Sequence, residues 1–107
     1  MKKSVDPLFE EGLRLFARKE FFECHEVIEA LWLRTDARDP HRDLYKGVIQ
    51  AAAALYQRGR GIESGARGLF RTAVGYLEKY EPEALGLDVT AFIGELKTHF
   101  KDTRGHS

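Results

Sequence analysis

Apolar residues recur at helical spacing along most of the chain, and breaks in this pattern divide it into five segments. The spacing predicts helices over residues 7–18, 21–34, 40–58, 64–80 and 89–101. Asp6, Asp39 and Asp88 stand directly before three of these segments, and aspartate is a preferred N-cap residue. Pro7 and Pro40 would occupy the first helical position, where proline is favoured because its missing N–H is not needed.

The stretches between these segments are polar or rich in glycine, as in TDARDPHRD and GRGIESG. EPEALG is expected to be a connector with room for one short helical turn, and the tail KDTRGHS is expected to be frayed. No useful β-alternation is present. The sequence therefore predicts an all-α fold, a compact bundle of about five helices in a single domain over residues 1–107, with an ordered core over about 6–101.

Composition narrows the class of protein. The chain has 107 residues, of which 43% are hydrophobic and 32% charged, with a formal net charge of zero. This balance disfavours a dedicated nucleic-acid binder, which usually has a basic excess. The start, MKKSVDPLFEEG, lacks the apolar region of a signal peptide, and no apolar run approaches the ~18 residues of a membrane span. We therefore expect a cytoplasmic protein with no membrane contact.

The segment FFECHEVIEALW contains the first candidate chemistry. On a helical wheel His25 lies in the same arc as Ile28, within about 60°, and so faces inward. Glu29 follows one turn later at the edge of that stripe and can approach His25. Glu26 points nearly the opposite way and is not expected to join them. The cysteine before His25 diverges from it by about 100°, so no catalytic pair is predicted there.

The segment GVIQAAAAL has small side chains and little charge, which indicates a helix that is packed on most of its surface. Gln50 within it is expected to be a largely buried amide that needs hydrogen-bond partners. His25 or Glu29 could supply one. The result would be a buried His/Glu/Gln network. Such a network could fix the register of the packed helices, or it could line a ligand pocket.

Two other kinds of site receive less support. The pattern HExxE lacks the second histidine of a zincin, and one histidine with one glutamate offers too few ligands, so no metal and no cofactor are predicted. No residue is assigned a catalytic role. Arg58, Arg60, Arg67 and Arg71 gather around the glycine-rich break and allow a weak nucleic-acid-binding alternative, which would require salt-sensitive association.

The combination of FFECHEVIEALW, LYKGVIQAAAALYQ and GARGLF resembles the bacterial and archaeal domain-of-unknown-function family 309 over nearly the whole chain, from Gly12 to about Phe92. The resemblance implies a small all-helical bundle without an established activity. The matching positions are His25, Glu26, Glu29, Trp32, Gly47, Gln50, Tyr56, Gly65 and Ala66. The sequence departs from the family at Gln57, where a histidine is typical, and at Ile62, where an asparagine is typical.

These features favour a non-enzymatic protein-interaction or ligand-binding module. Its candidate binding or network residues are His25, Glu26, Glu29, Gln50, Gln57 and Tyr56. A homodimer is plausible through exposed Phe22 and Leu33, with Trp32 near the edge. The partner would otherwise be an unknown protein or small ligand. The enzymatic alternative is a metal-assisted or acid–base hydrolase centred on His25 and Glu29.

Overall fold

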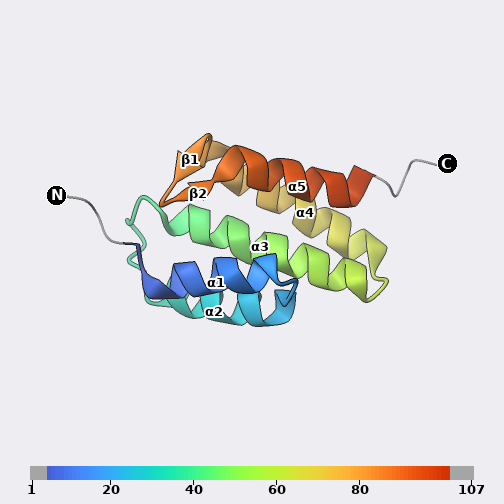
Figure 1. Cartoon of the computed structure of the whole chain (residues 1–107), viewed down its shortest axis with the longest axis horizontal. Coiled ribbons are helices and arrows are strands. Elements are labelled where there is room, and N and C mark those ends of the chain that lie inside the picture. Colours follow the sequence, from blue (N-terminus) through green and yellow to red (C-terminus); the bar gives the residue numbers. More distant parts are fainter. Residues whose placement is uncertain (1–4, 102–107) are drawn as a thin grey trace.

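Five α-helices form the molecule, as the hydrophobic pattern predicts. The structure is a computed structural model that describes residues 5–101 (Figure 1). Its helices are α1 (Pro7–Ala17), α2 (Phe21–Leu33), α3 (Arg42–Gly59), α4 (Glu63–Leu77) and α5 (Val89–Lys101). A short 3₁₀ helix, η1 (Glu78–Tyr80), and two strands, β1 (Glu83–Ala84) and β2 (Leu87–Asp88), connect α4 to α5. Apart from Lys101, the tail predicted to be frayed lies outside the described residues.

Helix α3 is the central element. It packs against α2 on one side and against α4 on the other, while α1 covers α2 (Figure 1). Half of the residues of α3 are buried, and all of these except Gly47 belong to one hydrophobic cluster that receives side chains from all five helices. No described helix has both the length and the apolar character that crossing a membrane requires.

Two of the predicted N-caps are confirmed. The Asp6 side chain accepts a hydrogen bond of 2.9 Å from the Leu8 N–H, with Pro7 as the first residue of α1. The Asp88 side chain accepts one of 2.9 Å from the Ala91 N–H at the start of α5. Both carboxylates satisfy N–H groups that have no partner within the helix.

The predicted start of α3 was wrong by two residues. Asp39 and Pro40 form a turn before the helix, in which the Asp39 side chain accepts from the His41 N–H at 2.7 Å. The carbonyl of Pro40 accepts from the Tyr80 hydroxyl at 2.7 Å, which ties this turn to the end of η1. Because these contacts hold the backbone in a turn, α3 begins only at Arg42 and has no side-chain cap.

The expected helical turn in EPEALG was also wrong, because this segment forms a β-hairpin. Strands β1 and β2 pair antiparallel, with Ala84 opposite Leu87. Leu85 and Gly86 between them both have positive φ, at 49° and 83°. Two positive φ values in a two-residue loop are typical of a type I′ turn, for which Asn-Gly is the usual signal. Because Leu85 stands where asparagine is usual, the sequence does not indicate this turn.

Close approach between α3 and α4 depends on the missing side chain of Gly47. A Cβ atom at this position would lie 2.7 Å from Cδ2 and Cγ of Leu77, which is fully buried in α4. Ala51, Ala52 and Ala54 are also fully buried in α3. The small side chains expected from the sequence therefore do bring neighbouring helices close together.

Cys24 belongs to this core. Its side chain is fully buried. Burial raises the pKa of the Cys24 thiol from its ordinary value of 9.0 to about 12, because a thiolate would lose its hydration there. The thiol is therefore an apolar packing group.

The packing at Gly47 generates the first prediction. Gly47→Ala should lower the free energy of unfolding by about 1–3 kcal/mol, since the added methyl group would overlap the fully buried side chain of Leu77. Gly68→Ala is the matched control, because a Cβ at Gly68 would meet nothing within 4 Å. This control should gain up to ~1 kcal/mol from better helix propensity. Chemical denaturation measures both, and equal effects of the two substitutions would contradict the close approach at Gly47.

Burial of Cys24 generates the second prediction. Ellman's reagent should label the native protein only as fast as the protein unfolds, whereas the chain in concentrated guanidinium chloride should react at once. The raised pKa adds a pH dependence, because the unfolded state loses the thiol proton first as the pH rises. Stability should therefore decline between about pH 9 and 12, at up to ~1.4 kcal/mol per pH unit, and be unaffected by this group below that range. Rapid stoichiometric labelling of the native protein would contradict the burial.

Candidate functional site

The outward side of α2 carries a cluster of one imidazole and two carboxylates. Nδ1 of His25 lies 3.7 Å from Oε2 of Glu26 and 3.9 Å from Oε1 of Glu29. One potential ligand atom from each residue lies within 4.8 Å of the other two. The side chains are 30%, 57% and 44% exposed, in the order His25, Glu26, Glu29. This group, called the His–Glu–Glu cluster below, is thus open to solvent.

The prediction that Glu26 stands apart from His25 was wrong. The helical wheel places the two Cα–Cβ bonds about 100° apart, but it does not describe how far a side chain can bend back. Glutamate has three rotatable side-chain bonds, and Glu26 lies on the exposed side of the helix. Its carboxylate therefore reaches Nδ1 of the neighbouring imidazole at nearly the same distance as that of Glu29.

The prediction of a buried polar network was also wrong. Among the residues that the structure describes, the buried ones are hydrophobic or glycine, and none is a polar or charged residue. Gln50 is half-buried, and within the described part of the chain no hydrogen bond joins its amide to His25 or Glu29. The pairing between α2 and α3 depends on the register of the two helices, which the wheel of a single helix does not contain.

The residues of α3 that face His25 are further along the helix than Gln50. His25 lines a small hollow of about 170 Å³ together with Phe22 from α2 and with Ala53, Tyr56 and Gln57 from α3. Tyr56 and Gln57 were both candidates from the sequence, so the hollow brings three of the predicted site residues together. The methyl group of Ala53 is too short to fill the space in front of the imidazole.

Gln57 also approaches α4. A Cβ atom added at Gly65 would lie 2.6 Å from Oε1 of Gln57. Gly65 therefore leaves room for the side chain at position 57, which gives a physical reason for a glycine in the first turn of α4. Neither this contact nor the role of Gly65 was predicted from the sequence, because only the packing of α3 on α4 brings the two positions together.

Phe22 and Tyr56 also line a larger groove. Their rings are 5.6 Å apart between centroids, and the groove has a volume of about 670 Å³. The groove lies between the α1–α2 turn and the end of α3. Its other lining residues are Lys19, Glu20, Phe21, Glu23, Leu55, Gly59 and Arg60. The exposed aromatic Phe22 is the sequence signal that could have located it.

Trp32 lies at the other end of the contact between α2 and α3. The Arg42 guanidinium carbon and the Lys46 ammonium nitrogen are 4.2 and 4.3 Å from the centroid of its ring. Both cations come from the first turns of α3, and each makes a cation–π contact. The indole is half-buried between the helices, as its position at the edge of the apolar stripe predicted.

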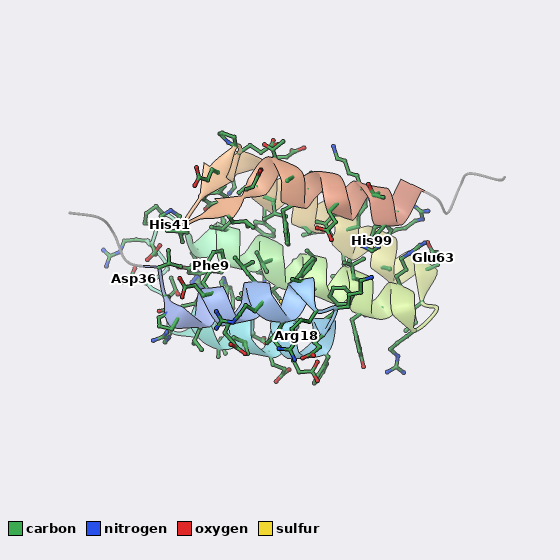
Figure 2. The ribbon with its side chains drawn as sticks, viewed as in Figure 1. Phe9, Arg18, Asp36, His41, Glu63 and His99 are labelled. Atoms are coloured by element: carbon green, nitrogen blue, oxygen red, sulfur yellow. The ribbon has the colours of Figure 1, made fainter. Side chains whose placement is uncertain are left out.

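The arginines near the α3–α4 turn are mostly engaged within the molecule. Glu63 forms an ion pair with Arg58 at 3.2 Å and another with Arg67 at 3.4 Å, at the end of the bundle where Figure 2 labels Glu63. Arg60 donates a hydrogen bond of 3.2 Å to the Tyr56 hydroxyl. The carboxylate of Glu63 offsets part of the positive charge of Arg58 and Arg67, which makes this region less attractive to a phosphate backbone.

Comparisons with known proteins agree with the motifs. The family model described as Domain of unknown function (DUF309) matches residues 9–69, which contain the His–Glu–Glu cluster and the hollow beside it. The uncharacterized protein YpuF of Bacillus subtilis (strain 168) is 36% identical over 74 residues, or 67% of this chain. The matched part is only 42% of YpuF, so the chain spans less than half the length of that relative.

A solved structure shares the fold. The crystal structure of the conserved hypothetical protein TTHA0068 from Thermus thermophilus matches with a TM-score of 0.75 and 35% sequence identity. The match covers 91% of this chain and 98% of that one. None of these names states an activity. With more than half of its residues matched by the family model, the chain belongs to the DUF309 family.

Proposed function

We propose that this protein is a small binding module that holds a divalent transition-metal ion at the His–Glu–Glu cluster. The observation that carries the proposal is the convergence of three ligand atoms within 4.8 Å from little more than one turn of α2. The earlier objection, that one histidine and one glutamate are too few ligands, no longer applies once Glu26 joins them. Three protein ligands with the remaining positions left to water are a common open arrangement for zinc.

The ligand atoms of His25, Glu26 and Glu29 are slightly farther apart than they would be around a bound ion. Imidazole nitrogen and carboxylate oxygen bind Zn²⁺ at about 2.0–2.2 Å, which puts ligand atoms of one ion roughly 3–3.5 Å apart. Closing from the present spacing requires only rotations of two largely exposed glutamate side chains. The mixed nitrogen and oxygen donors suit Zn²⁺, Co²⁺, Ni²⁺ or Mn²⁺ better than Ca²⁺ or Mg²⁺, which prefer oxygen ligands.

Charge also favours a cation at this place. Within the described part of the chain, the carboxylates of Glu26 and Glu29 lie near the imidazole of His25 and form no ion pair with a lysine or arginine. Other carboxylates of the molecule have such partners, as Asp6 has Arg34 at 2.8 Å. Two neighbouring carboxylates without a lysine or arginine partner attract a divalent ion.

Isothermal titration calorimetry with ZnCl₂ tests the metal site. His25→Ala and Glu29→Gln should each weaken binding by at least about tenfold, because each removes one of three ligands. His99→Ala on α5 (Figure 2) and Glu23→Gln on α2 are matched controls that leave the cluster intact and should bind like the wild type. His25 is partly exposed and has no buried partner, so its replacement should change stability by less than ~1 kcal/mol. Equal affinity in all four variants would contradict the site.

A second candidate function is metal-assisted hydrolysis, and the hollow beside His25 is the observation that favours it. A bound ion with open positions supplies an activated water. The hollow would receive the apolar part of a small ester next to it. Zn²⁺-dependent hydrolysis of p-nitrophenyl acetate should then disappear in Ala53→Leu, which fills the hollow while the three ligands remain. A rate no higher than that of ZnCl₂ alone would remove this candidate.

A further inference from the structure

The exposed face of α2 has an ordered distribution of apolar and charged side chains. At 100° per residue, Phe22, Glu26, Glu29 and Leu33 fall within about 60° of one another. Phe22 and Leu33 are 49% and 69% exposed, and they are two of the four exposed large hydrophobic residues in the described part of the chain. They stand at the two ends of α2, about 16 Å apart along its axis, and the His–Glu–Glu cluster lies between them.

This arrangement is self-complementary under a two-fold axis. If α2 of a second copy crosses the first in antiparallel direction at the middle of the helix, Phe22 of each copy meets Leu33 of the other. The same register sets Glu26 of each copy against Glu29 of the other, because the cluster is centred between the apolar ends. A surface patch that matches itself in this way is the requirement for an isologous dimer.

The charge of the clustered carboxylates determines whether two copies can associate through α2. Four carboxylates and two imidazoles would gather near the axis, and like charges at that spacing repel one another. The apolar ends alone do not offset this repulsion, because a contact limited to one 13-residue helix per copy belongs among the small interfaces. A divalent ion reverses the sign of the interaction, since it attracts carboxylates from both copies.

The proposed metal site lacks protein ligands on the side that would face the second copy. The His–Glu–Glu cluster supplies three protein ligands, all from one helix, and leaves the outward positions of an ion open. Helices in contact have axes about 8–10 Å apart, which brings glutamate side chains of the opposite helix within reach of those positions. A carboxylate of the second copy is thus placed to fill them.

We propose that divalent metal joins two copies of this chain through the outward faces of α2, with carboxylates of both copies around the ions. This inference rests on the proposed metal-binding function and adds the partner to it. The chemistry of the partner is fixed by the surface itself: an apolar residue at each end and a carboxylate pair at the centre. A second copy of the chain supplies all of these at the correct spacing.

Sedimentation velocity at micromolar protein concentration tests the proposal. The wild type should be a monomer in EDTA and a dimer when ZnCl₂ replaces the chelator. Leu33→Ser should bind Zn²⁺ in calorimetry under dilute conditions as the wild type does, yet dimerise at least about tenfold more weakly, because each copy loses its apolar contact. Ile62→Ser is the matched control, since Ile62 is another exposed large hydrophobic residue away from α2 and its replacement should leave the dimer intact.

The outcomes separate the two proposals. If the wild type binds Zn²⁺ and remains a monomer, the dimer is overturned and the metal site stands. A Zn²⁺-dependent dimer that Leu33→Ser leaves unchanged also overturns the α2 interface. Absence of any Zn²⁺ binding overturns the proposed function and the dimer with it. A dimer that persists in EDTA contradicts the role given to the metal.

Discussion

The close packing of α3 between α2 and α4 is the constraint on which the rest of the structure depends. A helix with a full complement of large side chains would hold its neighbours too far away to share one core. Gly47 and the buried alanines of α3 shorten these distances, and the side chain of Leu77 in α4 lies in the space that Gly47 leaves. In the same way, Ile28 of α2 lies against Gly12 of α1. Dispersion contacts and burial of apolar surface then stabilise the bundle without any buried polar or charged residue in the described part of the chain.

Because the core is packed around α3, the side chains on the outward face of α2 have no role in holding the bundle together. Cys24, Ile28 and Leu31 already anchor the helix inside, so the stability of the fold does not require particular side chains on the opposite side. Selection can therefore place charged groups there without a large effect on folding. The small hollow beside His25 has the same origin, because an alanine on α3 faces the imidazole where a larger residue would fill the space.

Most features that depend on periodicity or on local capping hydrogen bonds could be predicted, whereas features that depend on helix register, on distant contacts or on side-chain reach could not. Periodicity alone predicted the five helices, and local hydrogen bonding explains why the Asp6 and Asp88 caps were found. The start of α3 was misplaced because Tyr80, distant in sequence, holds Pro40 in a turn. In the candidate site, helix register decides that Gln57 and not Gln50 shares a hollow with His25, and the position of Glu26 depends on side-chain reach.

The residue at position 57 affects which ligands the candidate metal site can have. Gln57 is one of the two positions at which the sequence departs from the pattern it resembles, and its side chain lines the same hollow as His25. Ile62, the other departure, lies beside it, since both approach the space left by Gly65. A histidine at position 57 would offer a second imidazole near the cluster, whereas an amide is a poorer ligand for a transition metal. With glutamine at position 57, the proposed metal site relies more on carboxylates, and on ligands from outside the chain, than it would with a histidine there.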